Sequence, residues 1–290
     1  MSRETEKIFK FIQREIEKRG LTDEKEINEF IKNNLSNINL NDFDLDEDLS
    51  DEDFAIDIVE RAKYEEDEYE AISLIEEALS IDKDCIDAYA LLATKQSHPF
   101  LTEYFLKEAI KIGKRKFSNE FLEENKEHLW AIIETRPFLR AMSQLAHVYY
   151  TIGDVGKSTK ILERIITICP SDNLGIREML FTQLLSLKKF KKAKKYLDLF
   201  EDDALASTLY SRVFYSFYSD NDLEKTLYLL KAAQQCNPNI IKKILSPTNK
   251  FKLSENYTIG SPEEANYYCY FAKEIWQEDP ELIHWLKQNQ

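Results

Sequence analysis

The feature that most constrains this chain is a spacing of about 34 residues between small side chains, the length of a repeated pair of helices. Ser158, Ala193 and Thr226 lie 35 and 33 residues apart, each in a segment whose apolar residues follow a helical period. A helical pair of this size cannot bury both of its apolar faces alone, so consecutive pairs stack on one another. The spacing therefore predicts an all-α array of helical hairpins.

The residues inside each copy indicate the type of repeat. In the tetratricopeptide pattern, a first helix carries a large residue, a small neighbour and an aromatic residue; a second helix carries a small residue, a large one and a closing proline. The clearest copy spans residues 139–172, where the pattern is met by Leu145, Ala146, Tyr149, Gly153, Ser158, Leu162 and Pro170. Weaker copies are marked by Ala71, Ile75, Ala78, Ala90, Ala93, Leu106, Ala109, Leu184, Ala193, Leu197, Phe214, Thr226, Leu230, Ala233 and Pro238. We predict a right-handed superhelix of tandem tetratricopeptide-like hairpins over residues 51–240.

Segments without the repeat flank or interrupt this array. Residues 1–41 predict an N-terminal helical pair, and residues 42–50 predict an acidic linker. Within the array, residues 117–135 predict an inserted helix. Residues 241–290 predict an irregular crossing segment followed by capping helices. The first capping helix is expected to begin at Pro262, because Ser261 is a capping residue, Pro262 suits the first helical position and Glu264 the third.

Charge and cysteine content restrict the partner and the location. The net charge of −14 disfavours nucleic acid and anionic membranes as partners of the whole surface; it would favour a basic partner, although such a charge more often only keeps a protein soluble. No stretch approaches the roughly 18 apolar residues of a membrane span, and the charged N-terminus does not fit a signal peptide. The four cysteines are widely spaced without a C-x-x-C motif, which fits reduced thiols. We therefore expect a cytoplasmic protein with no membrane attachment.

Three segments of the chain resemble a known family. EALSIDKDCIDAYALLA, ETRPFLRAMSQLAHVYYTIGD and CPSDNLGIREMLFTQLL are similar to bacterial tetratricopeptide proteins related to the eukaryotic suppressor-of-tumorigenicity-seven proteins. The resemblance extends over about residues 52–240, and the N-terminal helical pair with its acidic linker also looks like the bacterial members. It implies the same helical-repeat fold. Because the bacterial family has no assigned activity, the resemblance implies no function.

The candidate binding surface is the concave groove that the first helices of such repeats line through a fixed set of positions. Tyrosine is well suited to this task, because it supplies a large contact area at low entropy cost. We predict that a protein or peptide binds in this groove, through Arg140, Ser143, His147, Tyr150, Glu178, Thr182, Ser211, Tyr215 and Tyr218.

Two other segments suggest different functions. Residues 153–159, GDVGKST, resemble the end of a phosphate-binding loop and would make the chain a nucleotide-dependent switch or an enzyme. However, Thr151 stands where that loop requires glycine, and a helix precedes it in place of a strand. The lysine cluster of residues 188–195 would contact RNA in an RNA-associated protein, although a solvated face is the usual role of such a run.

The remaining charged residues and histidines carry no motif for chemistry. Glu134, Arg136, Arg140 and Arg177 leave two interpretations open, an internal salt-bridge network and an anion site. The four histidines are scattered, and none has a metal-ligand spacing to another histidine or a cysteine. We therefore predict no catalytic residue, no metal and no cofactor. The predicted function is a protein- or peptide-binding scaffold without catalytic activity, with its partner and oligomeric state left open.

Overall fold

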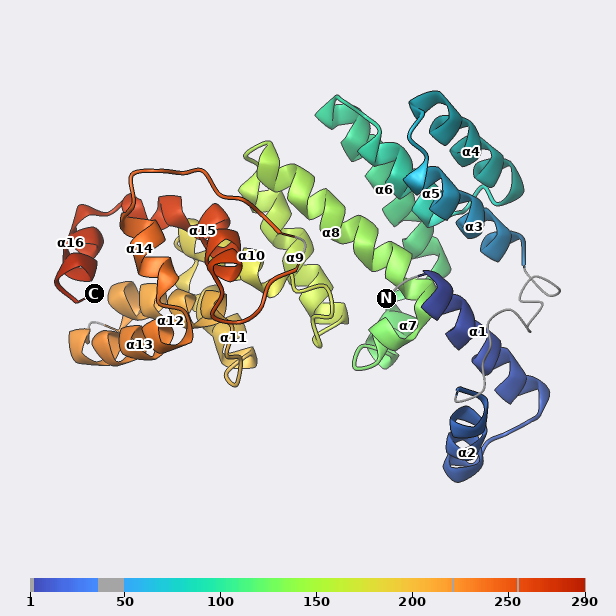
Figure 1. The fold of residues 1–290 in the computed structure, drawn as a ribbon, viewed down its shortest axis with the longest axis horizontal. Helices are drawn as coiled ribbons and strands as arrows, with labels where there is room; N and C mark the ends of the chain where they lie inside the picture. Colours follow the sequence, from blue (N-terminus) through green and yellow to red (C-terminus); the bar gives the residue numbers. More distant parts are fainter. Residues whose placement is uncertain (1–2, 36–49, 221, 255, 290) are drawn as a thin grey trace. The chain divides into compact units, whose positions relative to one another are not determined.

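The computed structural model describes residues 3–35, 50–220, 222–254 and 256–289. These residues form sixteen α-helices and no β-strand, so the prediction of an all-α fold is confirmed for the described part of the chain (Figure 1).

The chain divides into two compact units. Unit 1 comprises residues 1–148 with 168–170, and unit 2 comprises residues 149–167 with 171–290. Helix α8 lies mostly in unit 1 and α9 mostly in unit 2. Each unit has its own helical hairpins and its own candidate surface.

Unit 1 is built from hairpins that pack through small side chains. Helix α3 pairs with α4, and α5 pairs with α6 (Figure 1). Ala55, Ala62, Ala78 and Ala88 are fully buried in one core cluster, where they let neighbouring helices approach and larger aliphatic side chains interdigitate. The helices are α1 Arg3–Lys18, α2 Glu24–Leu35, α3 Asp51–Tyr64, α4 Glu68–Ile81, α5 Ile86–Thr94, α6 Pro99–Lys116, α7 Asn119–Glu124 and α8 Arg136–Thr151.

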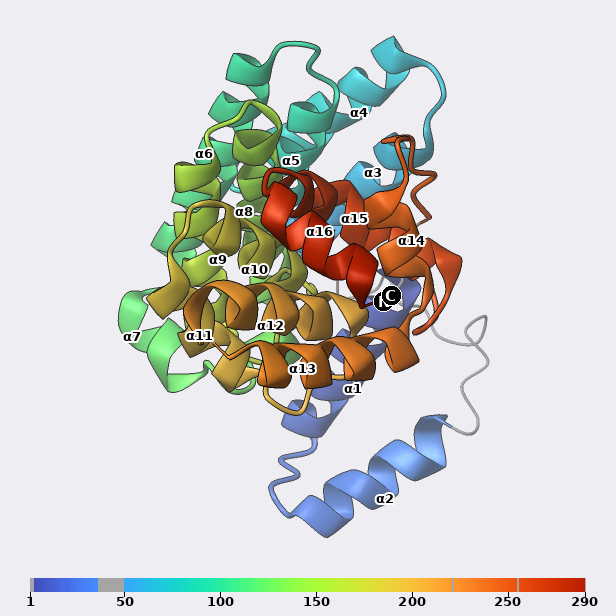
Figure 2. The same cartoon turned by 90° about the vertical axis from the view of Figure 1, so that its left-hand side faces the viewer.

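Unit 2 continues the same construction with larger side chains. Helix α12 forms a hairpin with α13 (Figure 2), and α14 pairs with α15. Local capping sets several helix starts: the side chains of Asp222 and Asp279 accept hydrogen bonds from first-turn amides of α13 and α16. The helices are α9 Val155–Ile168, α10 Arg177–Ser186, α11 Phe190–Leu199, α12 Ala206–Ser219, α13 Leu223–Cys236, α14 Asn239–Leu245, α15 Pro262–Gln277 and α16 Pro280–Gln288.

The residues that mark the predicted repeats lie in the core. In the clearest copy, Leu145, Ala146, Tyr149, Ser158 and Leu162 are at most 5% exposed. The same holds for most markers of the weaker copies, among them Ala71, Ile75, Ala78, Ala109, Leu184, Ala193, Leu197, Phe214, Thr226, Leu230 and Ala233. The predicted core positions of the hairpins are therefore confirmed.

The segment predicted as an inserted helix differs from that prediction. Residues 117–135 contain the short helix α7, followed by two 3₁₀ turns at Leu129–Ala131 and Ile133–Thr135. The hydroxyl of Thr135 donates to the carbonyl oxygens of Leu129 (2.6 Å) and Ile132 (2.8 Å). These side-chain bonds give the backbone an alternative to a continuous helix.

The C-terminal part contains helices α14, α15 and α16. Helix α15 begins at Pro262 and is capped by Ser261, whose hydroxyl accepts a hydrogen bond from the amide of Glu264 at 3.0 Å. The crossing segment expected to be irregular from residue 241 instead starts with helix α14, and its irregular part begins after Leu245.

Of the acidic linker at 42–50, only Ser50 lies among the described residues; it caps α3.

Candidate functional site

Helix α15 covers one face of unit 2. It packs against both α10 and α12, as seen in Figure 1. Its aromatic side chains meet those of the array: Tyr268 lies 5.8 Å from Tyr210, and Trp276 lies 5.3 Å from Phe214, between ring centroids. A helix that only capped the end of a stack would contact the last hairpin alone. Helix α15 therefore lies across neighbouring first helices, not merely at the end of them.

The start of α15 is fixed by a buried carboxylate. Glu264 accepts hydrogen bonds from the amide of Ala206 (3.0 Å), from the side-chain amide of Asn237 (2.9 Å) and from the amide of Gly260 (2.7 Å). Ala206 is the first residue of α12, so the carboxylate also meets the positive end of that helix. This attachment holds α15 to the array at a defined point.

The irregular segment before α15 is also tied down. The ammonium of Lys273 on α15 donates to the carbonyl oxygens of Ser246 (2.7 Å) and Thr248 (2.5 Å), and burial lowers its pKa. The hydroxyl of Tyr257 donates to the carboxylate of Glu178 on α10. Burial raises the pKa of Glu178, and this hydrogen bond opposes that rise. The segment thus forms part of the cover over α10.

This cover changes the accessibility of the groove residues predicted in unit 2. Glu178, Thr182 and Ser211 are 7%, 3% and 1% exposed, so their side chains do not face solvent. Tyr150 is half-buried, with its ring 5.5 Å from that of Phe271 on α15.

The two other tyrosines predicted for this groove lie in an aromatic group with Phe190. The ring of Tyr218 stacks on Phe190 at 5.9 Å, and Tyr215 meets the same ring edge-on at 6.4 Å. The hydroxyl of Tyr218 donates to the carboxylate of Asp279 at 2.7 Å. Both tyrosines therefore already have partners within unit 2.

Unit 1 has an open cleft on the corresponding face. Its volume is about 660 Å³. Helix α3 contributes side chains at a spacing that keeps them on one face, and α5 repeats the spacing. The lining residues are Glu6 from α1; Ile56, Val59, Glu60, Lys63 and Tyr64 from α3; Asp87, Ala90, Leu91, Thr94 and Lys95 from α5 and its C-cap; and Arg140 and Gln144 from α8.

The charges inside this cleft neutralise one another. The guanidinium of Arg140 lies 3.1 Å from Asp87 and 3.7 Å from Glu6, and the ammonium of Lys63 lies 3.7 Å from Glu60. The aliphatic side chains of the lining remain as its apolar part. The ring of Tyr64, which is 72% exposed, stands at the edge. The arrangement suits an apolar anchor surrounded by polar contacts.

Of the groove residues predicted in unit 1, Arg140 lines the cleft. Ser143 is half-buried and His147 is exposed on the same helix.

Sequence reasoning missed the residues from α3 and α5, although a signal for them exists. The predicted groove positions have fixed offsets from the small residue Ala146: three residues before it (Ser143), one after it (His147) and four after it (Tyr150). Applied to Ala90, the same offsets give Asp87, Leu91 and Thr94, and applied to Val59 they give Ile56, Glu60 and Lys63.

The charged set Glu134, Arg136, Arg140 and Arg177 forms ion pairs within the protein. In unit 1, Arg136 is 3.2 Å from Glu6 and bonds the carbonyl of Trp130 at 2.8 Å. Glu134 lies 3.8 Å from Lys10, which pairs at 2.7 Å with Asp53. These contacts attach α1 to the starts of α3 and α8. They favour the salt-bridge interpretation over an anion site.

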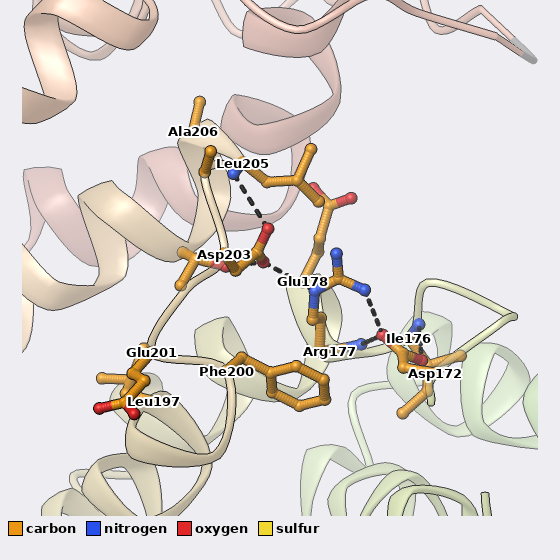
Figure 3. A network of polar contacts seen from close by, with 12 residues as sticks. Asp172, Ile176, Arg177, Glu178, Leu197, Phe200, Glu201, Asp203, Leu205 and Ala206 are labelled. Atoms are coloured by element: carbon orange, nitrogen blue, oxygen red, sulfur yellow. Dashed lines mark hydrogen bonds and ion pairs between the residues drawn. The ribbon is translucent and has the colours of Figure 1, made fainter. Parts of the chain in front are cut away.

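Arg177 belongs to a network of its own, in unit 2 (Figure 3). Its guanidinium lies 2.8 Å from Asp172 and 2.8 Å from Asp203. Asp172 has a left-handed backbone (φ 49°), and its carboxylate also accepts from the amide of Ile176 at 2.8 Å, at the start of α10. Thr208, on α12, donates to Asp203 at 2.6 Å. The network joins the loops that precede α10 and α12.

The pKa values in this network shift in opposite directions. Burial raises the pKa of Asp172 despite its bond to Arg177. Burial also acts to raise the pKa of Asp203, but hydrogen bonds from Arg177, Thr208 and the amide of Leu205 outweigh it, so the pKa of Asp203 is lowered.

The lowered pKa of Asp203 makes part of the stability depend on pH. A carboxylate with a lowered folded pKa stabilises the fold above its ordinary pKa, and this contribution is lost as pH falls through the lowered value. We expect Asp203→Asn to be destabilised at neutral pH, with the difference from the unchanged protein shrinking as pH falls. Urea unfolding of both proteins from neutral to acid pH measures this difference in stability. A difference that stays constant down to acid pH would contradict the assignment to Asp203.

The glycine turn at 153–159 is a connection between α8 and α9. Gly153 has a left-handed backbone (φ 82°), and Lys157 pairs with Asp154 at 2.7 Å. The hydroxyls that would face a phosphate and its metal are buried. Ser158 accepts from the side-chain amide of Gln183 at 2.8 Å, and Thr159 donates to the same side chain at 3.0 Å. The nucleotide alternative gains no support from this geometry.

The lysine cluster at 188–195 is largely exposed and partly paired. Lys192 lies 2.8 Å from Glu163, and Lys194 lies 2.7 Å from Asp198. The ring of Phe190 in its middle stacks on Tyr218 and is half-buried. The RNA alternative therefore lacks an open stacking ring at this residue.

Neither a metal-binding cluster nor a membrane-spanning helix is found among the described residues. Within the described ranges, no group of three or more His, Cys, Asp or Glu residues is placed to hold a metal ion. Among the same residues, no helix combines the length and apolar character needed to cross a membrane.

Comparison with known proteins gives distant relatives. The chain is 22% identical over 252 residues to a protein of Gallus gallus named "Suppressor of tumorigenicity 7 protein-like", covering 79% of this chain and 45% of the relative. It is 21% identical over 234 residues to a Bos taurus protein of the same name, covering 73% of this chain and 42% of the relative. The chain therefore spans less than half the length of these curated relatives. No family model and no solved structure matches it. The two matches support a distant relation to the suppressor-of-tumorigenicity-seven-like proteins.

Proposed function

We propose that this chain is a scaffold that binds a segment of another protein in the cleft of unit 1. The observation that carries the proposal is the contrast between two equivalent faces. The face of α10 and α12 is covered by the chain's own α15, whereas the corresponding face of α3 and α5 forms an open cleft of about 660 Å³. A face that holds a helix in one unit is suited to hold a chain segment in the other.

We further propose that the hairpins belong to a tetratricopeptide-like superhelix, as in the bacterial proteins that the sequence resembles. The burial of the repeat-marking residues supports this assignment. The four cysteines, all among the described residues, are free thiols, which supports a reducing cytosolic location. Catalysis has no part in the proposed role.

Site-specific photo-cross-linking in the native cell tests the binding site. A cross-linking side chain replaces Tyr64 or Gln144, both of which line the cleft, or Tyr69, which is 87% exposed on α4 and serves as the control. We expect the two cleft positions to capture the same protein and the control position not to capture it. The same product from all three positions, or none from either cleft position, would mean that the cleft is not the binding surface.

A further inference from the structure

We propose that the ligand of the unit 1 cleft is an amphipathic α-helix with a basic polar face, contributed by another protein. This inference rests on the proposed binding function and specifies its partner. Three observations carry it: the helix that packs on the equivalent face of unit 2, the apolar side chains among the polar lining of the cleft, and the distribution of charge along the chain.

Helix α15 is an internal example of such a ligand. Tyr257, in the segment before α15, bonds Glu178 on α10, and α15 itself packs against both α10 and α12, where Thr182 and Ser211 are buried. Glu178 and Thr182 stand three before and one after Phe181, and Ser211 stands three before Phe214. In unit 1 the same offsets from Val59 and Ala90 give residues that line the open cleft. The first helices of both units therefore present the same positions, and in unit 2 these positions are buried on helices against which α15 packs.

The chemistry of the cleft fits the apolar stripe of a helix. On α15 the buried stripe is formed by Tyr268, Ala272, Ile275 and Trp276, at helical spacing. The cleft offers the half-buried Ile56 and Leu91 as apolar contacts, with the ring of Tyr64 at the edge; Val59 and Ala90 also line it but are each only 6% exposed. A helix in a groove binds through anchors at such spacing, and an extended chain would alternate its side chains instead.

The charge distribution indicates a basic polar face. Unit 1 contains 35 Asp and Glu against 20 Lys and Arg, a net charge of −15, whereas unit 2 contains 18 against 19, a net charge of +1. Directly after Tyr64, at the edge of the cleft, the chain reads Glu65-Glu66-Asp67-Glu68. The charges within the cleft largely pair with one another, so the surrounding acidic surface decides the sign of the preferred partner. Helix α15 shows the opposite combination of charges: it carries three glutamates and one lysine, and it packs within unit 2, whose net charge is +1.

A pair of synthetic peptides tests this inference on the full chain. Both have the length of α15 and its apolar stripe; one carries lysine at the polar positions and its twin carries glutamate. Thr94→Trp fills the cleft without changing the charge, because Thr94 lines it and its side chain is exposed. Tyr69→Ala serves as a matched control outside the cleft.

We expect the lysine peptide to bind at least about tenfold more tightly than its glutamate twin, and Thr94→Trp to weaken it by about tenfold or more, as for loss of a central contact. Tyr69→Ala should leave the affinity within about twofold. Hydrogen exchange should slow in α3 and α5. If the lysine peptide bound Thr94→Trp as tightly as the unchanged protein, its binding would be non-specific attraction to the acidic surface. If the two peptides bound the unchanged protein equally well, the basic polar face would be refuted. Binding of neither peptide would refute the proposed ligand altogether.

The outcome separates this inference from the binding function on which it rests. If Tyr64 and Gln144 capture a cellular protein, but the cross-linked segment is acidic or extended, the cleft is a binding site and the basic-helix inference is wrong. If the cleft positions capture nothing, the binding function itself fails. A cross-linked basic helix would support both.

Discussion

Replacing Trp276 with alanine should lower the free energy of unfolding by about 3–5 kcal/mol, the range for removing a large buried aromatic side chain. Trp276 is fully buried, and its ring packs against those of Phe214 and Tyr210. Its indole N–H donates to the hydroxyl of Tyr268 at 2.9 Å, so the substitution removes that bond as well as creating a cavity. Urea unfolding of the full chain, followed by circular dichroism, measures the loss.

A residue on the same helix provides the matched control. Tyr270 is 44% exposed, and Tyr270→Ala should change stability by no more than about 0.5 kcal/mol. In Trp276→Ala, hydrogen exchange should accelerate in α10 and α12, because α15 covers both. A loss below about 1 kcal/mol, with exchange unchanged in those two helices, would mean that α15 is not an essential part of unit 2.

The helices and their core positions could be predicted because their signals are local. The small residues recur at one repeat length, and burial of Ala71, Ser158, Ala193 and Thr226 follows from helical period alone. The start of α15 was predictable for the same reason, since its cap involves only Ser261 and the residues just after it. Signals that span a few residues do not depend on where the rest of the chain lies.

The position of α15 could not be predicted, because contacts between distant residues determine it. Glu264 reaches the amide of Ala206, 58 positions away, and Tyr257 reaches Glu178, 79 positions away. The sequence marks α15 as amphipathic without saying which face of the array receives it. For this reason Glu178, Thr182 and Ser211 were predicted as an open groove, and they lie buried in unit 2.

The cleft of unit 1 was partly predictable. Arg140 was identified, and the offsets around Ala146 lead to Asp87, Leu91 and Thr94 when they are applied to Ala90. Leu106 follows Ala90 by 16 residues, as Leu162 follows Ala146, so the register of that copy could also have been read from the sequence. The pairing of Arg140 with Glu6 was not predictable, because Glu6 lies on α1, far away in the sequence.

Replacing Arg177 with methionine should cost about 3–5 kcal/mol of unfolding free energy, the range for breaking a buried ion pair by removing one partner. The side chain of Asp172 is 0% exposed and that of Asp203 is 13% exposed, so both carboxylates would lose their shared cation away from solvent. Methionine keeps the aliphatic stem, which isolates the loss of charge. The matched control is Arg115→Met, whose guanidinium is 55% exposed beside Asp84 and should cost at most about 1 kcal/mol.

The pH dependence identifies the cause of that loss. Without Arg177 the two carboxylates lose their favourable partner, so the pKa of each should rise, and the neutral forms then relieve the destabilisation as pH falls. The unfolding free energies of the Arg177→Met variant and the unchanged protein should therefore converge toward acid pH. A second comparison uses Arg177→Met with Asp203→Asn, which should be less destabilised at neutral pH than the sum of the two single changes, because one unpaired carboxylate is already neutral. If the loss were the same at every pH and the two changes were additive, the missing contact of Arg177 with the ring of Phe200 would explain it better than the ion pairs.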